Sequence, residues 1–177
     1  MMTDDALDVN VEKLNSSIEL SMRYHQRRRA FYERTHNVIM FLIVISGSTA
    51  FSDLAVYSVP IATALAALDL VWKPSHRARD HEMLFRRFSD LAIAVRTGDE
   101  SEENYGKWKK ERITIEADEP PVYWALANDC YNEVTRLTNS PSDVVQIGRW
   151  YRWTMHLLRH AGIHFQPDKS LLKGGVP

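Results

Sequence analysis

The feature that most constrains the fold of this chain is a long stretch with hardly any charge. Between Arg34 and Lys73 the only formally charged residues are Asp53 and Asp69. Pro60 interrupts the stretch, because proline favours the first turn of a helix and disfavours the helical conformation in the residue before it. We therefore expect two apolar helices separated by a short polar turn.

The two helices are predicted over about 35–53 and 54–72, the second beginning either at residue 54 or at Pro60. A helix of about 18 residues is roughly 27 Å long, against a hydrocarbon core of about 30 Å. A buried hairpin in a soluble protein is the alternative, since shorter apolar helices are more often core helices. The polar residues between Val38 and Ser52 are only small hydroxyls, whereas a solvated face would carry charges. This all-round apolarity favours a transmembrane hairpin.

Basic residues flank the apolar stretch on both sides, and the turn within it has none. Arg23, Arg27, Arg28, Arg29 and Arg34 precede the first helix, and Lys73, Arg77, Arg79, Arg86 and Arg87 follow the second. The positive-inside rule then places both termini in the cytoplasm and the turn on the outer side of the membrane. The expected membrane-interface anchors are Arg27, Arg28, Arg29, Tyr57, Trp72 and Lys73, although a solvated helix face would also explain the basic cluster.

The remaining sequence has helical periodicity, so the predicted fold class is all-α. We expect a two-helix transmembrane hairpin near the N-terminus, with long flanking cytoplasmic helices that form a helical bundle. The predicted parts are an N-terminal cytoplasmic amphipathic helix over 1–36 leading into the first span, the hairpin over 37–72, a cytoplasmic helical region over 73–162 and a loose tail over 163–177.

Apolar stripes predict which residues of the cytoplasmic helices are buried. The stripes are Leu7, Val11, Leu14 and Ile18; Leu84, Phe88, Leu91 and Val95, ending at Gly98; Tyr105, Trp108 and Ile115; Val122, Leu126, Cys130, Val134 and Leu137; and Val144, Ile147, Tyr151, Met155 and Leu158. Pro120 and Pro121 are expected to open the fourth of these helices, and Ser140, Pro141 and Asp143 the last one.

Nothing in the sequence predicts a catalytic centre, and no cofactor is expected. His156, His160 and His164 have the spacing of metal ligands on one helix face, but histidines in a last helical turn more often serve as capping or surface residues. Cys130 lies on an apolar stripe, as a small buried side chain would. Because Lys and Arg number 22 and Asp and Glu 23, the net charge of −1 does not favour nucleic acid. We therefore predict that the chain is not an enzyme.

Asp69 is the most informative polar residue of the apolar stretch. A carboxylate in a membrane span is costly, so it usually faces protein or water. It could belong to a ring of acidic groups at the inner mouth of an oligomeric pore, or it could pair with Lys73 at the interface. Small residues on both spans allow helices to approach closely and suggest a homo-oligomer; these are Gly47, Ala50, Ala62 and Ala66.

Three segments together resemble the SLATT family of two-span effectors in bacterial conflict systems. They are RRRAFYERTHNVIMFLIVISGSTAF, ALAALDLVWKPSHRARDHEMLFRRFSDL and ERITIEADEPPVYWALANDCYNEV, and the similarity extends over about 23–134. The resemblance implies a membrane effector of antiviral defence that oligomerises and permeabilises the inner membrane. It also implies a trigger from a sensor protein or a nucleotide second messenger made by a neighbouring gene, in an abortive-infection response.

Two classes of function therefore remain open. The first is a pore-forming effector whose hairpins assemble in the lipid bilayer. The second is a membrane-anchored helical interaction or regulatory protein without pore activity, in which the hairpin only tethers the cytoplasmic helices.

Overall fold

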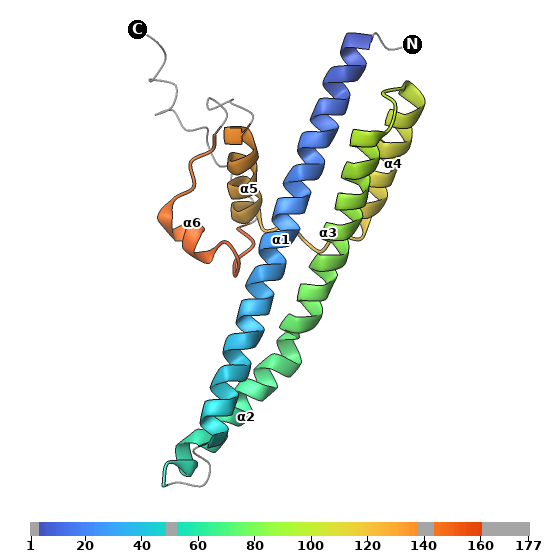
Figure 1. Cartoon of the computed structure of the whole chain (residues 1–177). Helices are drawn as coiled ribbons and strands as arrows, with labels where there is room; N and C mark the ends of the chain where they lie inside the picture. Colours follow the sequence, from blue (N-terminus) through green and yellow to red (C-terminus); the bar gives the residue numbers. More distant parts are fainter. Residues whose placement is uncertain (1–3, 49–52, 138–143, 161–177) are drawn as a thin grey trace. The chain divides into compact units, whose positions relative to one another are not determined.

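The structure is a computed structural model that describes residues 4–48, 53–137 and 144–160, and it is all-α, as predicted (Figure 1). The helices are α1 (Asp4–Ser48), α2 (Ala55–Trp72), α3 (Pro74–Thr97), α4 (Glu102–Ala117), α5 (Trp124–Leu137) and α6 (Arg149–Thr154). They form two compact units: unit 1 comprises Met1–His25 and Leu84–Pro177, and unit 2 comprises Gln26–Met83. Helices α1 and α3 each contribute residues to both units.

The main core of unit 1 confirms three of the predicted apolar stripes. Its buried residues come from the first part of α1, from α3 and from α4, and they are Leu7, Val11, Leu14, Ile18, Leu84, Phe88, Leu91, Ala92, Val95, Trp108 and Ile115. Each helix contributes one stripe at helical spacing, so three stripes are needed to enclose one apolar interior.

Three consecutive residues of α1 contact α5 and the segment that leads into it. Arg23 pairs with Glu133, the Tyr24 hydroxyl accepts the Tyr123 backbone N–H at 3.0 Å, and His25 Nε2 lies 3.1 Å from a Glu119 carboxylate oxygen. Hydrogen bonds to Glu19 and the nearby Glu133 carboxylate raise the pKa of Arg23, so its charge is retained. These contacts join residues roughly a hundred positions apart and were not predicted.

Helix α5 begins later than predicted. Pro120 and Pro121 do not open it, because the helix starts at Trp124 after a non-helical segment. Leu126, Cys130 and Val134 are buried as expected, with Leu126 and Cys130 beside Tyr24 in a second cluster. Val122 packs half-buried against this cluster from outside the helix, so its predicted contact is confirmed but its place on the helix is not. Leu137 is exposed, so its predicted burial was wrong.

The predicted last helix was also wrong, because within the described residues 144–160 the only helix is the short α6. Val144 and Ile147 are buried as expected, but they lie in a non-helical segment. The Asn132 side chain accepts the Val145 N–H at 2.7 Å and donates to the Val145 carbonyl at 2.8 Å. Because the Asn132 side chain binds both the N–H and the carbonyl of Val145, these two groups are not used in helical hydrogen bonds. Ser140, Pro141 and Asp143 lie outside the described residues.

Gly98 follows the end of α3, as predicted, but close packing explains the glycine. A Cβ atom there would lie 2.6 Å from Trp108 Cζ2 and 2.9 Å from the Ala94 carbonyl oxygen. We expect Gly98→Ala to lower the free energy of unfolding of unit 1 by about 1–3 kcal/mol, because the backbone carbonyl must shift.

Chemical unfolding in mild detergent, followed by Trp fluorescence, measures this change. Gly106 is the matched control, since it lies inside α4 with nothing within 4 Å of a Cβ. Gly106→Ala should instead stabilise the protein by about 0.5–1 kcal/mol, because alanine is the better helix former. Equal effects at both glycines would contradict the packing explanation.

Candidate functional site

Unit 2 exposes an apolar surface over the last part of α1 and the whole of α2. Its exposed apolar residues include Val38, Met40, Phe41, Leu42, Val44, Ile45, Val56, Tyr57, Val59, Ile61, Leu68, Leu70 and Val71. Within α2, whose residues are all described, Ser58 is the one buried residue. Monomeric soluble proteins rarely expose so large a contiguous apolar surface.

One stretch of the described residues is long and apolar enough to cross a membrane. It is Ala55–Thr97, which comprises α2 and α3, and it contains the second predicted span. The first predicted span does not qualify within the described part of the chain, and residues 49–52 at its end lie outside it. Its apolar residues from Val38 onward continue α1 as one uninterrupted helix (Figure 1). Of the hairpin, the second helix alone is thus identified as a candidate span.

Helix α2 begins at Ala55, which decides between the two starting points. The Ser58 N–H donates to the Leu54 carbonyl at 3.0 Å, so the helical ladder is already established before Pro60. Pro60 therefore lies inside the helix, and of the two expected starting points the one near residue 54 is confirmed. A proline this close to the start removes one donor without ending the helix.

Asp69 pairs with a histidine on α1. Its carboxylate lies 2.9 Å from His36 Nδ1, and the two side chains are about a quarter exposed, at 22% for Asp69 and 30% for His36. The alternative, an ion pair between the Asp69 and Lys73 side chains, is not observed. The two residues are joined only by the Lys73 backbone N–H, which donates to the Asp69 backbone carbonyl at 2.8 Å. The sequence could have indicated this pair. His36 and Asp69 lie almost equally far from Asp53 in the turn, so two antiparallel helices would place them at the same level.

An aromatic and cationic cluster lies at the polar end of the apolar surface. Arg28 is buried, bonds to the Tyr32 hydroxyl and lies over the Tyr32 ring, 4.6 Å from its centroid. His81 stacks on Tyr32 at 5.7 Å, and Trp72 meets the same ring edge-on at 6.3 Å. The burial of Arg28 differs from the exposed interface position expected of it, because its guanidinium is used within unit 2.

The other expected anchors remain accessible at least in part. Arg27 and Trp72 are half-buried, while Tyr57 and Lys73 are exposed. Arg29 binds Glu33 at 2.7 Å, and this hydrogen bond, with the nearby Glu33 and Glu82 carboxylates, raises the Arg29 pKa.

Lys73 separates α2 from α3 and has a left-handed backbone, with φ 50° and ψ 53°. The proline that follows it disfavours the right-handed helical conformation, so the helix is interrupted at this residue.

The small residues proposed for span packing are largely unused within the chain. Gly47 is exposed with nothing within 4 Å of a Cβ, Ala66 is exposed, and Ala62 is half-buried. Ala50 lies outside the described residues. Gly47 and Ala66 therefore leave room for the close approach of another helix.

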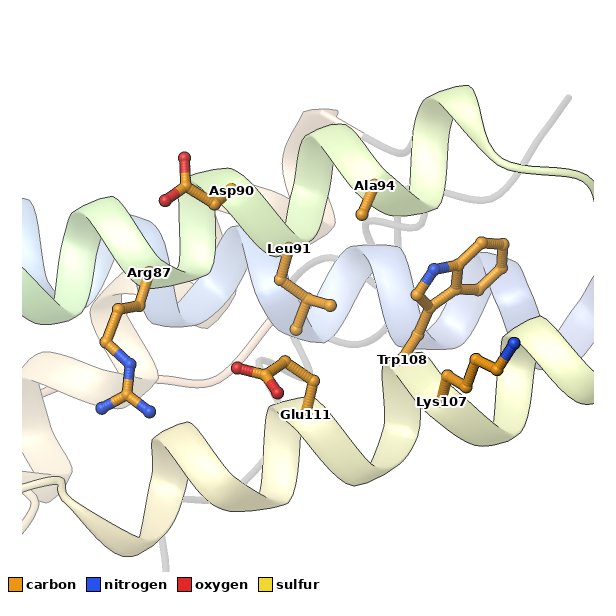
Figure 2. Close-up of a pocket in the computed structure, with 7 residues that line it drawn as sticks. All are labelled: Arg87, Asp90, Leu91, Ala94, Lys107, Trp108 and Glu111. Atoms are coloured by element: carbon orange, nitrogen blue, oxygen red, sulfur yellow. The ribbon is translucent and has the colours of Figure 1, made fainter.

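Each unit has a pocket lined largely by charged and polar residues. In unit 2 a groove of about 360 Å³ borders the His36 side of the Asp69 pair, lined by Glu33, His36, Asn37, Ser75, Ala78, Arg79 and Glu82. In unit 1 a pocket of about 390 Å³ lies between α3 and α4, lined by Arg87, Asp90, Leu91, Ala94, Lys107, Trp108 and Glu111 (Figure 2). Arg87 and Lys107 are balanced by the carboxylates of Asp90 and Glu111. The pocket therefore has no net positive charge that would attract a phosphate group.

The histidines that were weak candidates for metal binding do not gather into a metal site in the described part of the chain. The sequence predicted that His156 and His160 lie on one helix face. Helix α6 ends at Thr154, before either histidine, so this prediction was wrong. His160 Nε2 instead lies 2.8 Å from the Thr154 hydroxyl, and its ring meets Tyr151 edge-on. No group of three potential metal ligands occurs among the described residues, and His164 lies outside them. Cys130 is buried, as predicted.

Comparison of this chain with protein-family profiles, with curated proteins and with solved structures found no match. Its function must therefore be argued from the surfaces and pairs described above.

Proposed function

We propose that this protein is an oligomeric effector of bacterial defence that permeabilises the inner membrane when a sensor protein or a nucleotide signal triggers it. The resemblance to the SLATT family motivates the biological role. The observation that carries the physical part is the apolar surface of unit 2, which ends at the Asp69–His36 pair. Both termini lie in the cytoplasm in this proposal, and both apolar helices cross the bilayer.

The apolar surface supports membrane insertion because its cost in water is large. Removing one large apolar side chain from water contributes about 1.5–3 kcal/mol, and α2 alone exposes several such side chains over most of its circumference. The exception is one stripe through Ser58, Ala62, Leu65 and Asp69, which is buried or half-buried. A partner protein would cover one stripe of a helix, whereas lipid covers every side.

The polar pair and the small residues support assembly around a water path. A single hairpin is too small to enclose such a path, and a partly exposed carboxylate beside lipid is costly unless it meets water or another subunit. Gly47 and Ala66 offer the exposed positions at which neighbouring helices could approach closely.

A membrane tether is the second candidate function. Unit 1 has its own apolar core and would suit a docking module held at the membrane by α2. In that case the protein would localise to the membrane without changing its permeability.

Induced expression with a membrane-potential dye tests the proposal, with carbonate washing as the measure of insertion. We expect the wild-type protein to depolarise cells and to stay with washed membranes. Ile61→Arg should greatly reduce both signals, because an arginine near the middle of a span costs about 2.5–3.5 kcal/mol. Ile113→Arg is the matched control, since Ile113 is equally exposed but lies on α4, and it should change neither signal.

The two candidate functions predict different results. Carbonate-resistant protein in fully polarised cells would reject the pore and favour the tether. Recovery of the wild-type protein in the soluble fraction without detergent would reject both.

A further inference from the structure

The segment after α5 carries an exposed surface that the proposed function does not use. Trp150 is 62% exposed and Trp153 77%, and their rings lie 6.0 Å apart on one face of α6. Leu157 and Leu158 are exposed just after this helix. We call the residues Arg149, Trp150, Arg152, Trp153, Leu157 and Leu158 the tryptophan surface.

The exposure of this surface does not result from a loosely attached segment. Its other side is buried, since Val144, Ile147 and Thr154 are enclosed and Met155 packs against the cluster around Leu126. The hydrogen bonds of Asn132 to Val145 hold the beginning of the segment. The Trp124 N–H donates to the Arg159 carbonyl at 3.2 Å and holds its end.

The charge of the segment has one sign. Residues 144–160 include three arginines and no Asp or Glu. Arg149, Arg152 and Arg159 are exposed, and no ion pair joins any of them to another residue that the structure describes. Arg149 and Arg152 are neighbours on the surface of α6, three residues apart, beside the two tryptophans.

We propose that the tryptophan surface docks onto the anionic headgroup region of a lipid bilayer. Tryptophan favours the boundary between headgroups and acyl chains, where its ring is apolar and its N–H can reach water or phosphate. Arginine binds lipid phosphates through paired N–H donors, and a surface with positive charge only complements a negative membrane. This contact is additional to any span, and it would hold the α5–α6 region of unit 1 against the membrane.

A fluorescent reporter on the full-length chain tests the docking. Leu157→Cys is labelled with an environment-sensitive dye, and labelled wild-type protein serves as the blank because its Cys130 is buried. The protein is added from detergent to phosphatidylcholine vesicles with or without phosphatidylglycerol. We expect higher, blue-shifted emission in the vesicles that contain phosphatidylglycerol, and the change should diminish as salt is added.

Two charge variants distinguish docking from non-specific attraction. Arg149→Gln with Arg152→Gln should lower the ratio of docked to undocked reporter by about thirtyfold, since each arginine near an anionic surface contributes roughly a fivefold factor. Lys109→Gln with Lys110→Gln removes the same charge from α4 and should leave that ratio within about twofold, because those lysines lie outside the proposed surface. When the same dye is attached at Ile113→Cys, its emission should be the same with vesicles as without them.

The proposal is overturned if the reporter at position 157 does not respond to phosphatidylglycerol, or if both charge variants weaken its response equally. It is also overturned if the response grows with protein concentration in the absence of vesicles, because a second copy would then cover the surface. A reporter response from protein that carbonate removes would support the docking while rejecting the proposed span.

Discussion

Replacing Asp69 with asparagine is expected to lower cation permeation several-fold without changing the amount of protein in the membrane. If the proposed pore forms, each subunit contributes one Asp69 carboxylate near its inner mouth, and a ring of carboxylates concentrates cations there. The amide is nearly the same size and costs less beside lipid, so insertion should not suffer. Single-channel recording in planar bilayers measures conductance and cation preference.

His36 provides a control of opposite sign, because it is the partner of Asp69. His36→Gln keeps a hydrogen-bond donor beside the carboxylate but cannot carry positive charge, so cation permeation should equal or exceed that of the wild type. Lys73→Ala should leave the effect of Asp69→Asn in place, since the Lys73 side chain is not the partner of Asp69. Unaltered conductance and selectivity in Asp69→Asn would remove Asp69 from the ion path and leave it as a structural pair with His36.

Replacing Phe88 with alanine is expected to cost about 3–5 kcal/mol of the free energy of unfolding, which is a large fraction of the stability of a typical domain. Phe88 is fully buried in the core of unit 1, and its ring stacks on His25 at 5.6 Å. Removing it leaves a cavity and loosens the residue that contacts Glu119. Chemical unfolding in detergent, with near-UV circular dichroism to report tertiary packing, measures the loss.

Ile93→Ala is the matched control on the same helix. Ile93 is 58% exposed, so its truncation removes little buried surface and should cost less than about 1 kcal/mol. Similar losses at Phe88 and Ile93 would contradict the orientation of α3 in the core of unit 1.

Local periodicity was sufficient to predict the helices and most of the buried residues of unit 1. Leu7, Val11, Leu14 and Ile18 are all buried, because a stripe at helical spacing has to be covered by a neighbouring element. The apolar character of α2 was also visible in the sequence, since it depends on composition and not on what the helix contacts. Periodicity failed within residues 144–160, where the Asn132 side chain binds both the N–H and the carbonyl of Val145.

The partners of the polar residues were decided by the tertiary structure. The sequence identified Asp69 as a costly carboxylate and Arg28 as an interface cation. In the folded chain Asp69 instead pairs with His36, and Arg28 is buried against Tyr32. The same holds for Tyr24 and Tyr123, whose hydrogen bond joins residues 99 positions apart. Spacing along one helix determines which side chains share a face, and this chain's sequence determined that much by itself. Which side chain lies opposite depends on how two helices are placed against each other, and their packing in three dimensions decides that placement.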